Sequence, residues 1–262
     1  MLKKLIKYDV RKMIFNLPYF YLASLVFALL TRFVNIWKDI QFFFILGQIF
    51  QGTTIALIVN SLANTILGVL VRSFRASFYG DESYLTHTLP TSKNKLLLSK
   101  FLSALIVVFL TILVILLCLI IMFYSSEFIS LIKQSLSLVV IGLDISPAGL
   151  ITIISVAICF QLLSMLLMGF ASIVKGHSYN NGKIAKSFLW FGIFYVISGI
   201  VSLMLISLVL LFSGNIEEVF ATVMKGETFI ILIVSTIFIY ALYTVAFYLI
   251  TNKLFNKGVN VD

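Results

Sequence analysis

The chain contains few side chains that could perform acid–base, nucleophilic or metal chemistry. Its only histidines are His87 and His177, and no H-E-x-x-H sequence is present. No Asp or Glu falls in the interior of any long apolar segment, so a pair of carboxylates cannot form there. A serine nucleophile in such a segment would also lack a histidine base. These absences argue against an enzyme, and against a carrier driven by protons or sodium ions.

The nearest approach to an ATP-binding motif is the segment 176–184, which reads GHSYNNGKI. It has one residue too many between its two glycines, and Ile184 stands where a P-loop has the Ser or Thr that binds magnesium. We interpret it as a chance similarity. No cofactor is therefore expected on this chain. If the protein moves a substrate against a gradient, another polypeptide must supply the energy.

Uncharged polar residues do occur inside the apolar segments. Thr53, Asn60 and Asn64 are spaced i, i+7 and i+11, which puts them on one face of a helix. Gln161 lies within a later apolar segment. Amides in hydrocarbon need hydrogen-bond partners. Either these residues bond to neighbouring helices, or they line a weakly polar path for an amphipathic substrate.

The elements that carry these residues are expected to be membrane helices. Of the 262 residues, 61% are hydrophobic and 11% are charged, whereas soluble domains average about 45–50% and about 25%. The two cysteines, Cys118 and Cys159, lie in apolar runs and imply no disulfide. Six segments are long enough to cross a bilayer as helices: about 17–37, 43–71, 101–124, 147–174, 188–213 and 228–250. The sequence predicts an all-α polytopic membrane protein with six transmembrane helices, forming a single domain over 1–262.

The basic residues predict the orientation in the membrane. Fifteen of the nineteen lysines and arginines fall in 1–16, 72–100, 175–187 and the tail after residue 250. Cytoplasmic loops are enriched in these residues, so both termini are expected in the cytoplasm. This bias also explains the net charge of +9 without a nucleic-acid partner.

Residues 1–16 are predicted to form an amphipathic helix in the cytoplasmic interface. Apolar residues recur at helical spacing, as at Leu2, Leu5 and Ile6, and most lysines fall on the opposite arc, towards anionic lipid. Asp9 is the exception, because it falls among the apolar residues. It either reaches water at the edge of the helix or forms a salt bridge with another chain.

Two outer loops also have helical patterns. In 213–227, Asn215 can cap a helix whose first turn holds Glu217 and Glu218. The stretch 126–143 is a weaker second case. Short outer helices are therefore expected before the fourth and sixth spans.

The segment 72–100 is long and aromatic for a loop that only joins two helices. Phe74 and Phe78 share one face of a short helical segment, which Gly80 ends. Exposed aromatic residues on such a loop indicate a protein-contact patch, unless they rest in the headgroup region. The candidate contact residues are Phe74, Arg75, Phe78, Tyr79, Asp81, Glu82, Tyr84 and Leu85.

This loop resembles the first cytoplasmic loop of ABC-2-type transporter permeases from Gram-positive bacteria. The shared elements are Gly80–Glu82, Tyr84–Thr86, Thr88–Pro90, Ser92 and the Leu-rich run Leu96–Lys100. Ser83 stands where many relatives have Gly. The resemblance covers about twenty residues, and the plan of six spans with both termini inside agrees with it over the whole chain.

The resemblance implies a permease subunit in the bacterial cytoplasmic membrane. Its start would form an elbow helix, and 72–100 would carry a coupling helix that docks on a separate ATP-binding cassette ATPase, which binds ATP and magnesium. Such permeases act as dimers, identical or paired with a related chain, and their outer helices help to close the exit. The expected activity is export of an amphipathic substrate, such as a peptide toxin, bacteriocin, antibiotic or lipid-like molecule.

A second hypothesis is a membrane scaffold that transports nothing and anchors a cytoplasmic partner, such as an immunity or sensor subunit. It predicts the same loop and the same topology. Turnover distinguishes the two, because only a permease couples substrate to ATP hydrolysis.

Overall fold

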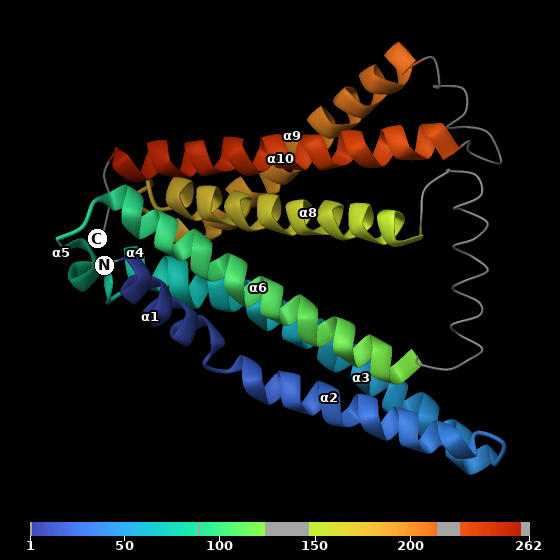
Figure 1. The fold of residues 1–262 in the computed structure, drawn as a ribbon. Helices are drawn as coiled ribbons and strands as arrows, with labels where there is room; N and C mark the ends of the chain where they lie inside the picture. The colour runs from blue at the N-terminus through green and yellow to red at the C-terminus, as the bar shows by residue number, and fades with distance from the viewer. Residues whose placement is uncertain (1, 89, 124–146, 214–225, 258–262) are drawn as a thin grey trace. The chain divides into compact units, whose positions relative to one another are not determined.

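The computed structural model describes residues 2–88, 90–123, 147–213 and 226–257, and this part of the chain consists of helices joined by short turns, without strands (Figure 1). The predicted outer helices over 126–143 and 213–227 lie almost wholly outside the described residues. The elements in chain order are α1 (Leu2–Ile14), α2 (Leu17–Val34), η1 (Asn35–Trp37), α3 (Gln41–Leu67), η2 (Gly68–Arg75), α4 (Ala76–Tyr79), α5 (Ser83–Thr88), α6 (Lys93–Phe123), α8 (Pro147–Gly176), α9 (Lys183–Ser213) and α10 (Gly226–Asn256).

Six of these helical stretches are long and apolar enough to span a membrane, as predicted. They cover Leu17–Trp37, Gln41–Tyr79, Lys93–Phe123, Thr152–Gly176, Lys183–Phe212 and Thr228–Asn256. Each of these helices contains or closely matches one of the six apolar segments of the sequence. Both reflect the minimum length that a helix needs to cross a bilayer.

The second span is longer than the sequence predicted. The helix continues from Gln41 to Tyr79 through η2, a π-helical stretch, and α4. Its 39 residues correspond to roughly 58 Å at 1.5 Å per residue, about twice the ~30 Å of hydrocarbon in a bilayer. The helix therefore continues eight residues beyond the predicted apolar segment 43–71, and it ends before Gly80, as the sequence predicted for the helical part of 72–100.

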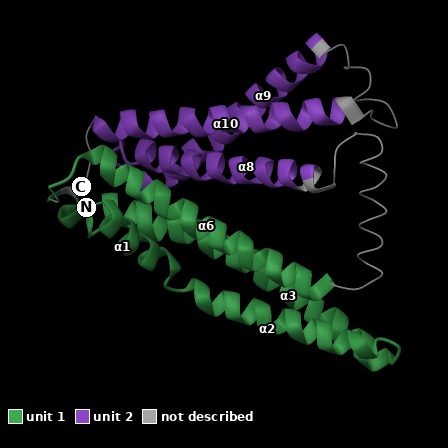
Figure 2. Cartoon of the chain, viewed as in Figure 1, with its two compact units in different colours: residues 1–129 green, residues 130–262 purple. Residues whose placement is uncertain are grey.

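The chain divides into two compact units, residues 1–129 and residues 130–262 (Figure 2). In the first unit α2, α3 and α6 pack on one another, and α1 packs against α6 and η2. In the second unit α8 packs against both α9 and α10. The single domain expected over 1–262 stays a prediction.

Hydroxyl groups join the helices of the first unit. The Tyr21 hydroxyl lies 2.6 Å from Thr111 Oγ1, which is 3.0 Å from Thr65 Oγ1. Thr31 and Thr54 form a second buried pair at 3.3 Å. Without a hydrophobic driving force between helices in lipid, such hydrogen bonds and close packing hold a helix bundle together.

The helix predicted over 1–16 is present as α1, but the two readings of Asp9 are wrong. Asp9 is only 4% exposed, so it does not reach water. Its partner is Lys100 of α6, in the same chain, at 2.5 Å. The acid lies on the apolar side of α1 because that side packs on the helix that carries Lys100.

Candidate functional site

The rings of Phe74 and Phe78 are buried inside the first unit. Both are 0% exposed, and they contact each other edge to face with their centroids 5.1 Å apart. The expectation that these two rings are exposed for a partner is therefore wrong. Their spacing on one helical face is as predicted, but that face packs against the chain itself. Arg75 and Tyr79, on the same helix, are half-buried.

The turn that follows is exposed. Gly80 ends α4, and a Cβ there would lie 2.9 Å from the carbonyl oxygen of Ala76, so the turn leaves no room for a side chain. Asp81 is exposed, and α5 presents Tyr84 and Leu85, which are 69% and 74% exposed. Of the predicted contact residues, these three lie on the surface.

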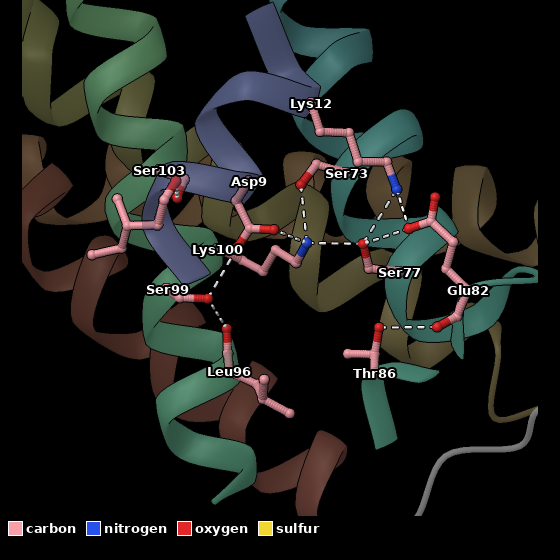
Figure 3. Close-up of polar contacts among 11 residues, drawn as sticks. Asp9, Lys12, Ser73, Ser77, Glu82, Thr86, Leu96, Ser99, Lys100 and Ser103 are labelled. Carbon is pink, nitrogen blue, oxygen red and sulfur yellow. Dashed lines mark hydrogen bonds and ion pairs between the residues drawn. The ribbon is translucent and has the colours of Figure 1, made fainter. Parts of the chain in front are cut away.

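Behind this turn lies a buried polar cluster centred on the ammonium group of Lys100 (Figure 3). It donates to Asp9 Oδ1 at 2.5 Å, to Ser77 Oγ at 2.8 Å and to Ser73 Oγ at 3.3 Å. The Ser99 hydroxyl donates to the other oxygen of Asp9 at 3.0 Å. A buried charge is tolerated only when it is paired and hydrogen-bonded, and here both charges are.

Ser77 links this buried pair to a second, partly exposed pair. Its hydroxyl lies 3.5 Å from both Glu82 Oε2 and Lys12 Nζ, and Lys12 forms an ion pair with Glu82 (Figure 3). The side chain of Glu82 is 43% exposed, so it lies at the edge of the cluster. Through these contacts the turn before α5 is tied to α1, α4 and α6.

A cavity of about 180 Å³ lies between the cluster and α5. Tyr8 and Leu5 of α1, Leu85 and Thr86 of α5, and Leu96 of α6 line it together with the polar cluster. Its wall therefore carries two carboxylates, one ammonium group and several apolar side chains.

Sequence reasoning missed most of this cluster. The sequence places Ser73, Ser77, Ser99 and Lys100 in the segment 72–100, and it predicts that Lys12 faces anionic lipid. The one available signal was Asp9, a single acid among apolar residues, which requires a basic partner. The sequence separation of 91 residues between Asp9 and Lys100 concealed that partner.

The residues proposed to line a path are placed on two different units. On α3, Asn64 Nδ2 donates to the carbonyl oxygen of Asn60 at 3.0 Å and lies 3.2 Å from Asn60 Oδ1. Thr53 donates to the carbonyl oxygen of Phe50 in its own helix. Gln161, on α8 of the second unit, is exposed. In the first unit, these hydrogen bonds stay within α3 and do not join neighbouring helices.

Among the described residues, no group of three or more His, Cys, Asp or Glu side chains is positioned to hold a metal ion. No protein-family model, no curated protein and no solved structure matches the chain. The six long apolar helices define its class as a multi-pass membrane protein.

Proposed function

We propose that this chain is the permease subunit of an ATP-binding cassette exporter, driven by a separate ATPase that contacts the exposed turn around α5. The proposed contact surface consists of Asp81, Tyr84 and Leu85, with the exposed edge of Glu82. An acid beside an exposed aromatic and an exposed aliphatic side chain suits a protein partner, because interface hot spots combine apolar anchors with charged rims.

The observation that carries the proposal is the connection between this turn and the membrane helices. Glu82 is paired with Lys12 of α1, and Ser77 joins that pair to Lys100 of α6. A displacement of α5 would therefore act on α1 and on the start of α6 through these polar contacts. In the proposed mechanism, closure of the ATPase moves this turn, and the helices switch between inward and outward access.

A second permease copy would cover helices that the chain itself leaves open. Only 6% of the span residues of α9 and of α10 are buried within the chain, against 28–33% for the other four spans. A hollow of about 530 Å³ between α9 and α10 has an apolar lining that includes Val209, Val234 and Phe238. This lining and the amide face of Asn60 and Asn64 suit an amphipathic substrate better than a bare ion.

The remaining parts of the proposal concern the membrane. The helix α1 acts as an elbow in the cytoplasmic interface, and α5 with its flanking turn acts as the coupling element. Both termini lie in the cytoplasm of a bacterial cell, and no ATP or magnesium binds to this chain.

Replacing Tyr84 and Leu85 together with alanine should remove the ATPase from the purified complex. Each is an exposed anchor, and a hot spot contributes about 2 kcal/mol or more, so the double variant should recover at least ~30-fold less ATPase. The measurement is affinity purification of the tagged chain from its native membranes, with the co-purified ATP-binding cassette protein quantified by mass spectrometry.

The matched control is the pair Tyr19 and Leu22 of α2, an aromatic and an aliphatic residue that are 77% and 67% exposed on a membrane span. Alanine at both should leave ATPase recovery unchanged. Undiminished ATPase in the Tyr84 and Leu85 variant, or the same loss in the control, would contradict the proposal. If the chain is instead a scaffold, the ATPase would still co-purify with it. The reconstituted complex would then show no substrate-stimulated ATP hydrolysis in vesicles.

A further inference from the structure

The turn that joins α8 and α9 carries lysines that aromatic rings support. Lys186 Nζ lies 4.4 Å from the centroid of the Tyr179 ring, and Lys175 Nζ lies 5.9 Å from the same centroid. Lys175 Nζ also lies 5.2 Å from the ring of Trp190. Two ammonium groups therefore share one tyrosine ring at this end of the second unit.

No acid in the surrounding sequence can balance these charges. The whole stretch from 147 to 213, which includes α8, the turn and α9, contains no Asp or Glu. In the first unit, by contrast, the buried Lys100 is paired with Asp9. The acids that flank this stretch in sequence are Asp144 before α8 and Glu217 after α9, each 31 residues from the nearer of Lys175 and Lys186.

The turn between α8 and α9 lies at the ends of two spanning helices, where the headgroups of anionic lipids can reach its lysines. Leu189, in the second turn of α9, is 59% exposed and lies three residues after Lys186, on the same side of the helix. Lysine and aromatic side chains beside an exposed apolar residue match a phospholipid, which has a phosphate next to its acyl chains. Tryptophan and tyrosine also favour this depth, because each combines an apolar ring with a hydrogen-bond donor.

We propose that the Lys175, Tyr179, Lys186 and Trp190 cluster is a binding site for one anionic phospholipid. The two ammonium groups bind the headgroup phosphate, and Leu189 contacts an acyl chain. This site does not depend on the proposed exporter function, since it concerns membrane lipid rather than substrate or ATPase.

The local backbone fixes this arrangement. Gly182 has a positive φ of 66°, a conformation that favours glycine, and it immediately precedes α9. His177 is only 3% exposed, and its Nδ1 lies 2.9 Å from the carbonyl oxygen of Ile173. Lys175 and Lys186 therefore lie on either side of a short connection.

The test uses the intrinsic fluorescence of Trp190. The chain has only two tryptophans, so a Trp37→Phe background isolates Trp190. The protein is reconstituted in equimolar phosphatidylcholine and phosphatidylglycerol, with bromines carried on the acyl chains of either one lipid or the other. If the two lipids mixed randomly around the protein, brominated phosphatidylcholine and brominated phosphatidylglycerol would quench Trp190 fluorescence equally. We expect stronger quenching by brominated phosphatidylglycerol, with a several-fold preference, since a basic residue near an anionic surface favours binding by about fivefold.

Lys175→Gln and Lys186→Gln should each reduce this preference about fivefold, whereas Lys186→Arg should retain it. Lys183→Gln is the matched control, because it removes the same charge from the same turn at a lysine outside the cluster. If all three lysine variants lost the same share of the preference for phosphatidylglycerol, general surface charge would explain the preference, and the proposed site would be wrong. The absence of preference in the parent protein would overturn it too, as would displacement of the preference by inorganic phosphate.

Discussion

Replacing Lys100 with methionine should destabilise the folded protein by about 3–5 kcal/mol, the usual cost of removing one partner of a buried ion pair. Asp9 would then remain as an uncompensated charge that is only 4% exposed. The loss should appear as unfolding at a markedly lower denaturant concentration in detergent micelles.

The double variant Asp9→Asn with Lys100→Met should recover much of the lost stability, because it removes both charges. Lys12→Met is the matched control. Its partner Glu82 is 43% exposed, and partly exposed ion pairs contribute about 0–1 kcal/mol. Equal losses from Lys100→Met and Lys12→Met would contradict the structure, as would a double variant that is less stable than either single variant.

Gly176→Ala should disrupt the packing of α8 on α9. A Cβ at this position would lie 2.5 Å from the backbone nitrogen of Ser187 and 2.6 Å from its Cα, and neither atom can move without shifting α9. Overpacking of a well-packed site costs typically about 1–3 kcal/mol, and a clash with backbone is expected to reach or exceed the upper end of that range. The measurement is thermal unfolding in detergent, together with the yield of monodisperse protein.

Gly192→Ala and Gly199→Ala are the matched controls on α9. An added Cβ at either position meets nothing within 4 Å, so the substitution should be neutral or slightly stabilising through better helix propensity. If Gly176→Ala behaves like these controls, the close approach of α8 and α9 is wrong.

The spanning helices were predictable because hydrocarbon imposes a length and an apolar composition that few soluble segments share. The amphipathic pattern of residues 2–14 likewise predicted α1. Neither inference needed knowledge of distant contacts. The end of the second span was less predictable, since Arg72 and Arg75 ended the apolar run while the helix itself continued to Tyr79.

Burial was harder to predict than helix formation. The spacing of Phe74 and Phe78 placed both on one helical face, but periodicity does not say whether that face packs on its own chain or on a partner. The polar residues of α3 show the same limit. The sequence emphasised Thr53, Asn60 and Asn64, whereas Thr54, Ser61 and Thr65, each one position further along, are the buried ones.

The most direct test of the account asks whether the proposed ATPase contact surface faces the cytoplasm. Tyr84→Cys is introduced after Cys118 and Cys159 have been replaced with serine, and a membrane-impermeant maleimide is applied to intact cells and to opened cells. Lys38→Cys, at the exposed turn between α2 and α3, is the control for the outer face. The account predicts that residue 84 is labelled only in opened cells, whereas residue 38 is labelled in intact ones. Labelling of residue 84 in intact cells would contradict it.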